Sequence, residues 1–177
     1  MSYLRVFLDM TIVGIFLASV VGKVRSRAAF HAFVGAVRDL GGIPVRWVRA
    51  AAAFVVVLEA AAAVLVALPA AITTIAGLTL AAGLLVAFTV VLVRALRRAP
   101  GPACHCFGGD GDAVAPRHVV RNLVLLGGCA AGVVMGPSTE GAREPAGLAL
   151  CALVAGVCVG AVALLDDLAA LLRPAKP

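Results

Sequence analysis

Charged residues are scarce in this chain. They make up 14% of its 177 residues, whereas soluble domains carry roughly a quarter. Hydrophobic residues reach 63%, and one small water-soluble core cannot hide that much alanine, valine and leucine. The shortage of charge excludes an ordinary soluble domain and predicts that a lipid bilayer surrounds most of the surface.

The sequence also lacks a solenoid repeat and the features of a cleavable leader. No segment recurs at a fixed period. The first apolar stretch is too long for a signal peptide, and its basic cluster follows it instead of preceding it. We therefore expect residues 1–177 to form a single membrane domain that retains its first helix.

Five apolar windows are long enough to cross a bilayer, for which a helix needs about 20 apolar residues. They are Val6–Gly22, Ala50–Leu68, Ala71–Val93, Val119–Gly136 and Ala146–Leu165. The first and fourth are short, so four spans with one interfacial segment remain an alternative to five. The predicted fold class is all-α: a polytopic transmembrane helical bundle of four to five spans, whose many small residues permit close helix contacts.

The segment between the first two windows has a different pattern. Its large apolar residues recur at helical spacing and are Phe30, Phe33, Val34, Val37 and Leu40. This pattern predicts a short amphipathic helix that lies in the membrane interface, with Trp47 beyond it as an anchor at headgroup level.

The 15 basic residues are distributed unevenly. If five spans alternate across the membrane, 13 of these residues lie on one side and only Arg5 and Arg143 on the other. An excess of Lys and Arg near span ends marks the cytoplasmic side, so the loop before the fourth span would be cytoplasmic and the N-terminus outside. The net charge of +6 then serves topology and lipid contact, and nucleic acid is not an expected partner.

The one sizeable polar loop carries Cys104, His105 and Cys106, followed by two glycines that let a partner's backbone approach closely. A Cys-x-Cys pair can close a small strained disulfide, and strain makes such a bond labile. His105 and nearby guanidinium groups would favour the thiolate, which is the attacking species in disulfide exchange. The motif is typical of redox chemistry.

Two other interpretations of this loop remain open. Its thiolates, with His105 or His118 as a further ligand, could hold Cu(I) or Zn(II) in a non-catalytic assembly subunit that binds metal or docks a partner. The loop could also contain two cysteines without a chemical role. Cys129, Cys151 and Cys158 lie among small residues of the predicted spans, where we expect them to be packing residues.

Three ionisable residues lie in or near the predicted spans: Asp9, Glu59 and Arg121. A charge at mid-membrane costs several kcal/mol unless it is neutralised or paired, so each marks a candidate functional position. We expect Glu59 to face other helices, protonated or hydrogen-bonded. Arg121 could anchor the cysteine loop or bias a thiolate, or its guanidinium could extend to lipid headgroups.

Several of these segments, taken together, resemble the MauE branch of the DoxX-like redox-associated membrane proteins, named for methylamine utilisation. The matching features are the basic run from Lys23 into Phe30, the Leu40–Pro44 segment, a span with Glu59, the Cys104–Gly108 loop, and Arg121-Asn122 at a helix start. The resemblance covers most of the chain. His105 departs from it, because a small residue is common between the two cysteines.

The resemblance implies a thiol–disulfide redox protein that assists the maturation of exported proteins, beside a thioredoxin-like partner or the client itself. It implies Cys104 and Cys106 as the redox pair, with Glu59 and Arg121 at recurrent polar positions. High alanine and arginine content suggests a bacterium, and hence its plasma membrane. No cofactor is specified; a quinone would need an apolar pocket beside the cysteines. This role favours thiols that are accessible from outside, whereas the charge distribution favours the cytoplasm.

Overall fold

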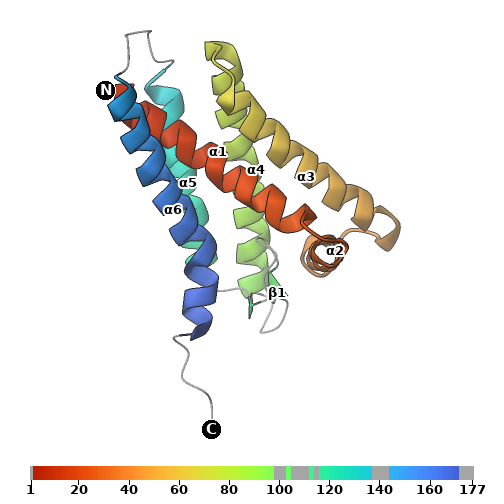
Figure 1. Ribbon diagram of the computed structural model, residues 1–177. Helices are drawn as coiled ribbons and strands as arrows, with labels where there is room; N and C mark the ends of the chain where they lie inside the picture. Colours follow the sequence, from red (N-terminus) through yellow and green to blue (C-terminus); the bar gives the residue numbers. More distant parts are fainter. Residues whose placement is uncertain (1, 98–102, 105–111, 114–115, 137–143, 172–177) are drawn as a thin grey trace.

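A computed structural model of the chain describes residues 2–97, 103–104, 112–113, 116–136 and 144–171. Within these ranges the elements are α1 (Ser2–Val24), α2 (Arg27–Gly41), α3 (Val45–Ala67), α4 (Ala71–Arg97), α5 (Pro116–Val134) and α6 (Pro145–Leu171) (Figure 1). The two-residue strands β1 (Ala103–Cys104) and β2 (Asp112–Ala113) pair antiparallel between α4 and α5. The predicted all-α class is confirmed.

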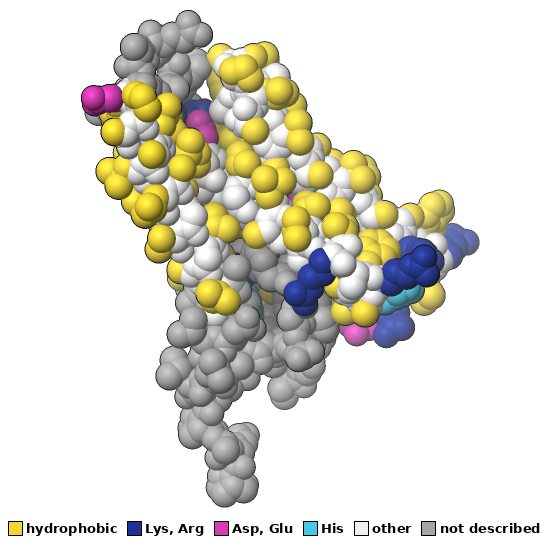
Figure 2. All heavy atoms as spheres, in the orientation of Figure 1, with side chains coloured by type: hydrophobic (Ala, Val, Ile, Leu, Met, Phe, Trp, Pro, Cys, Tyr) yellow, Lys and Arg dark blue, Asp and Glu magenta, His cyan; other side chains and the backbone are white. Residues whose placement is uncertain are grey.

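Five of the described helices are long and apolar enough to cross a membrane, namely α1, α3, α4, α5 and α6. Their outer faces carry large apolar side chains, such as Phe54, Val57, Leu150 and Val157, each more than half exposed. Figure 2 shows hydrophobic side chains along the length of the helices, while Lys and Arg gather mainly at the end that carries α2. The protein is a multi-pass membrane protein with five spans in the described part of the chain.

The interfacial helix predicted for Phe30–Leu40 is α2. Ser26 caps its start, since the Ser26 hydroxyl accepts a hydrogen bond of 3.0 Å from the Ala29 amide. Gly42 ends it in the left-handed conformation, with φ of 60°, which glycine adopts without steric cost. Figure 1 looks almost along its axis, so α2 lies across the ends of the spanning helices and buries Phe33 against them.

Helix α1 packs against α2, α3, α5 and α6, and α5 packs mainly on α4. One buried stripe runs along α1 at spacings of three and four residues; it comprises Arg5, Asp9, Ile12, Phe16, Ser19 and Lys23, of which only Asp9 is half-buried. Ile12 and Phe16 join the apolar core with Ala62, Leu78 and Cys129. The polar residues of the stripe lie toward its two ends, with Arg5 and Asp9 near the start of α1 and Ser19 and Lys23 near its end. Ionic groups of α1 are therefore buried near both ends of this helix.

Helices α3 and α4 approach most closely near the short turn that joins them. A Cβ atom at Gly77 would lie 2.7 Å from the backbone nitrogen of Val66, and Ala62 and Ala63 are buried beside this contact. Toward the opposite end, where α2 lies, the ribbons of α3 and α4 diverge (Figure 1). Small residues thus close one end of this helix pair and leave the other end wider.

The substitution Gly77→Ala should destabilise the bundle. The added methyl group meets the α3 backbone, which cannot rotate away, so we expect a loss of roughly 1–3 kcal/mol in the free energy of unfolding. Unfolding of the purified protein in mixed detergent–SDS micelles measures it. The matched control is Gly83→Ala on the same helix, where a Cβ meets nothing within 4 Å; equal loss in both variants would contradict the close contact.

Candidate functional site

The Glu59 carboxylate lies inside the bundle, 1% exposed, and is bound by two residues of α1. The Lys23 ammonium donates to both carboxylate oxygens at 2.5 and 2.6 Å, and to the Ser19 hydroxyl at 2.7 Å. The Ser19 hydroxyl in turn donates to Glu59 Oε1 at 3.3 Å. Ser19 and Lys23 reach one carboxylate because residues four apart share a helix face. The expectation that Glu59 faces other helices is confirmed.

Aromatic rings surround the ammonium of this ion pair. The Lys23 Nζ lies 4.8 Å from the ring centroid of Phe33 on α2 and 5.7 Å from that of Phe88 on α4. The faces of these rings attract a cation, and a desolvated cation gains more from them than an exposed one. Four helices therefore meet at one buried charge pair, with α1 and α3 supplying the charges and α2 and α4 the rings.

The structure corrects one sequence-based assignment. Lys23 was counted among the residues that orient the protein in the membrane, yet its side chain is 2% exposed and paired with Glu59. Arg5, counted on the opposite side, is also buried; it binds Asp9 at 2.8 Å and the carbonyl of Gly136 at 2.8 Å. Without these two residues the basic count becomes twelve against one, so the asymmetry remains.

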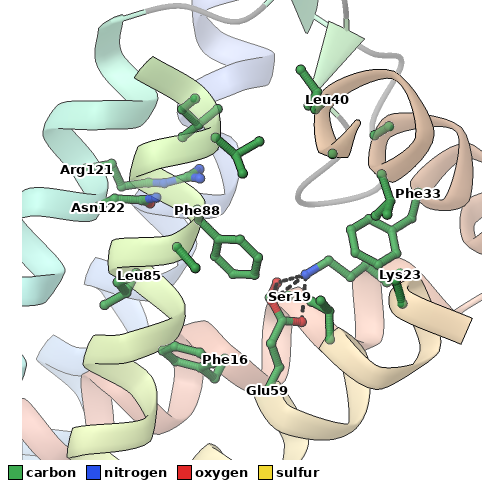
Figure 3. Close-up of a pocket in the computed structure, with 18 of the residues that line it drawn as sticks. Phe16, Ser19, Lys23, Phe33, Leu40, Glu59, Leu85, Phe88, Arg121 and Asn122 are labelled. Carbon is green, nitrogen blue, oxygen red and sulfur yellow. Dashed lines mark hydrogen bonds and ion pairs between the residues drawn. The ribbon is translucent and has the colours of Figure 1, made fainter. Parts of the chain in front are cut away.

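A cavity of about 240 Å³ lies beside the Lys23–Glu59 pair (Figure 3). Residues of α1, α2, α3, α4 and α5 line it, and most of them are apolar, including Phe16, Leu85 and Phe88. Its polar lining residues are Ser19, Lys23, Glu59, Arg121 and Asn122. Figure 3 shows Arg121 and Asn122 on one side of the cavity and Lys23, Ser19 and Glu59 on the other.

This cavity brings together two residues that the sequence singled out. Glu59 on α3 and Arg121 on α5 both line it, although they are 62 positions apart in the chain. Arg121 is half-buried and Asn122 is 4% exposed, so both point into the bundle near the start of α5. Arg121 therefore contributes to the wall of the cavity, in addition to any contact with headgroups.

The cysteine loop lies only partly within the described residues. His105 and Cys106 are outside them, and Cys104 is described by its backbone alone, which pairs with Asp112 in the β1–β2 ladder. Figures 1 and 3 place this ladder at the end of the bundle where α2 lies. The loop thus starts at the same end of the molecule as the cavity.

The structure also describes the three cysteines outside the loop and one of the candidate metal ligands. Cys129 is fully buried in the core, as expected of a packing residue, and Cys151 and Cys158 on α6 are half-buried. Of the four candidate metal ligands only His118 has a described side chain, which is buried on α5. No group of three His, Cys, Asp or Glu side chains among the described residues could hold a metal ion.

The family model of methylamine utilisation protein MauE matches residues 1–135, about three quarters of the chain. The chain belongs to the MauE family. The matched part includes the ion pair, the cavity and the cysteine loop, while α6 begins beyond it. No curated protein and no solved structure gives a significant match to the chain. The resemblance to MauE is therefore confirmed.

Removing one charge of the Lys23–Glu59 pair should be costly. Lys23→Met leaves a buried carboxylate without its counter-charge, and we expect roughly 3–5 kcal/mol lower unfolding free energy in SDS titrations. The double variant K23M/E59L removes both charges and should recover most of this loss. Arg38→Met is the control, because the Arg38–Asp39 pair is exposed and contributes at most about 1 kcal/mol. A Lys23→Met effect as small as this control would contradict the buried pair.

Proposed function

We propose that this MauE-family membrane protein exchanges thiols and disulfides through Cys104 and Cys106, and so assists disulfide formation in exported proteins from the bacterial plasma membrane. The observation that carries the proposal is the position of the loop's first strand, β1, at the end of the bundle that holds the Lys23–Glu59 pair and the cavity. A costly buried ion pair at the same end of the bundle as the strand that begins the cysteine loop is more typical of a functional site than of a simple membrane anchor.

The surroundings of the loop favour thiolate chemistry. Arg94 and Arg97 are exposed on the last turns of α4, which precedes the loop, and Arg117 lies in the first turn of α5, which follows it. Positive charge near a cysteine stabilises its thiolate, the form that attacks disulfides. The β1–β2 pairing brings the two ends of the segment that holds Cys106 next to each other.

The exchange needs two steps, each balanced in sulfur and electrons. In the oxidising direction a partner thiolate attacks the Cys104–Cys106 disulfide, forms a mixed disulfide and releases one cysteine of the loop as a thiolate. A second partner thiolate then attacks the mixed disulfide, so the partner leaves oxidised and the loop is reduced by two electrons. The partner is a thioredoxin-like protein or the exported client.

A trapping experiment tests this function. A chain with Cys106→Ser or Cys104→Ser keeps one loop thiol, and because the exchange is reversible this thiolate can attack the disulfide of an oxidised partner and release one partner thiolate. The mixed disulfide should accumulate, since the second loop cysteine that would resolve it is missing, and it is visible as a heavier band that reductant removes. Cys158→Ser is the control, because Cys158 lies on α6, outside the loop, and this variant should trap nothing. Mass spectrometry of the band identifies the partner, and the compartment of that partner shows on which side of the membrane the loop lies. The distribution of basic residues favours a cytoplasmic partner.

Two outcomes would count against the proposal. One is that Cys104 and Cys106 stay fully reduced in growing cells by differential alkylation, with no trapped partner in either serine variant. The other is copurification of stoichiometric copper or zinc that is lost in both serine variants. That result would favour a soft-metal site in a non-catalytic assembly subunit.

A further inference from the structure

The cavity beside the Lys23–Glu59 pair combines two properties that suit few ligands. Its body is made of aliphatic and phenylalanine side chains, which do not hold ordered water well. Its edges carry an ammonium, a carboxylate, a guanidinium and an amide, from Lys23, Glu59, Arg121 and Asn122. Lys23 and Glu59 bind each other, whereas a lipid acyl chain has no group that could hydrogen-bond with Arg121 or Asn122, and a water-soluble polar ligand would lose its hydration against the apolar walls.

The route into this cavity leads from the bilayer. Ala51 and Val55 of α3 and Ala87 and Val91 of α4 line it, where α3 and α4 diverge beyond their contact at Gly77. Ala87 is exposed on the outer surface of a spanning helix, so the cavity reaches the lipid-facing side of the bundle. A ligand that dissolves in the membrane could enter between these helices without crossing water.

We propose that the cavity binds the ring of a membrane quinone. The ring packs against Phe88 beside the Lys23–Glu59 pair, and Arg121 and Asn122 line the side of the cavity from which a ring carbonyl can accept a hydrogen bond. The apolar tail leaves between α3 and α4 into the lipid. A cavity of about 240 Å³ suits a small ring system with its tail outside.

This assignment rests on the proposed function in one respect, because it gives the cysteine loop an electron acceptor. When Cys104 and Cys106 form their disulfide, the two thiols lose two electrons and two protons. The quinone gains the same two electrons and two protons and becomes the quinol.

Photoaffinity labelling tests the site without depending on the cysteines. The purified C104S/C106S chain is incubated with a short-chain azido-benzoquinone, illuminated and digested, and the labelled peptides are identified by mass spectrometry. Label should appear on α3 or α4 near Ala51 and Val91 and should be competed away by unlabelled short-chain benzoquinone. Ala51→Phe, which fills the cavity, should weaken labelling by about tenfold, or roughly 1.4 kcal/mol.

The matched control is Ala53→Phe, which adds the same side chain two residues away at an exposed position outside the cavity lining, and should label like the parent chain. Equal labelling of the Ala51→Phe and Ala53→Phe chains would overturn the proposal. A copurified phospholipid that the benzoquinone does not displace would also overturn it. A second variant, Asn122→Leu, removes an amide from the cavity wall and should also weaken labelling. Because the labelled chain lacks both loop cysteines, this assay can detect quinone binding even if the trapping experiment finds no partner. Equally, a trapped partner would not require quinone binding, so the two proposals can fail separately.

Discussion

The buried ion pair between Lys23 and Glu59 is the interaction on which the arrangement of this bundle depends. Two charges inside a membrane protein are tolerated only when each neutralises the other and the remaining donors and acceptors are satisfied. Ser19 completes the hydrogen bonds, and Phe33 and Phe88 surround the ammonium. These contacts connect α1 to α3 and bring α2 and α4 to the same point, so the pair fixes the end of the bundle that holds the cavity.

The two ends of the α3–α4 pair differ in how closely the helices pack. Near the turn, Gly77 and small alanines let the backbones touch, which is the usual way in which helices associate in lipid. At the α2 end the two helices diverge, and Val55 of α3, Phe88 and Val91 of α4 and the ion pair line the cavity. Close packing at one end therefore supports an open site at the other, and the cysteine loop starts at that open end.

Much of the fold follows from patterns in the sequence, but the site follows only in part. Apolar windows predicted all five spans within a few residues, and the spacing of Phe30 and Phe33 predicted α2, because both patterns are local. The burial of Glu59 was also predictable from its place in a span. Its partner was not, because Lys23 follows a span and precedes two arginines, like an ordinary topological charge. One signal was available: Lys23 is one of two lysines beside 13 arginines, and it falls four residues after Ser19. The cavity depends on how five helices pack, which no local pattern reports.

The central claim is that the cavity and the cysteine loop act as one site. The most direct measurement is the oxidised fraction of Cys104 and Cys106 in growing cells, obtained by differential alkylation of the Ala51→Phe and Ala53→Phe chains. The account predicts that filling the cavity with Ala51→Phe shifts the loop toward the dithiol, while Ala53→Phe leaves it as in the parent chain. An unchanged oxidised fraction in a folded Ala51→Phe chain would contradict the account.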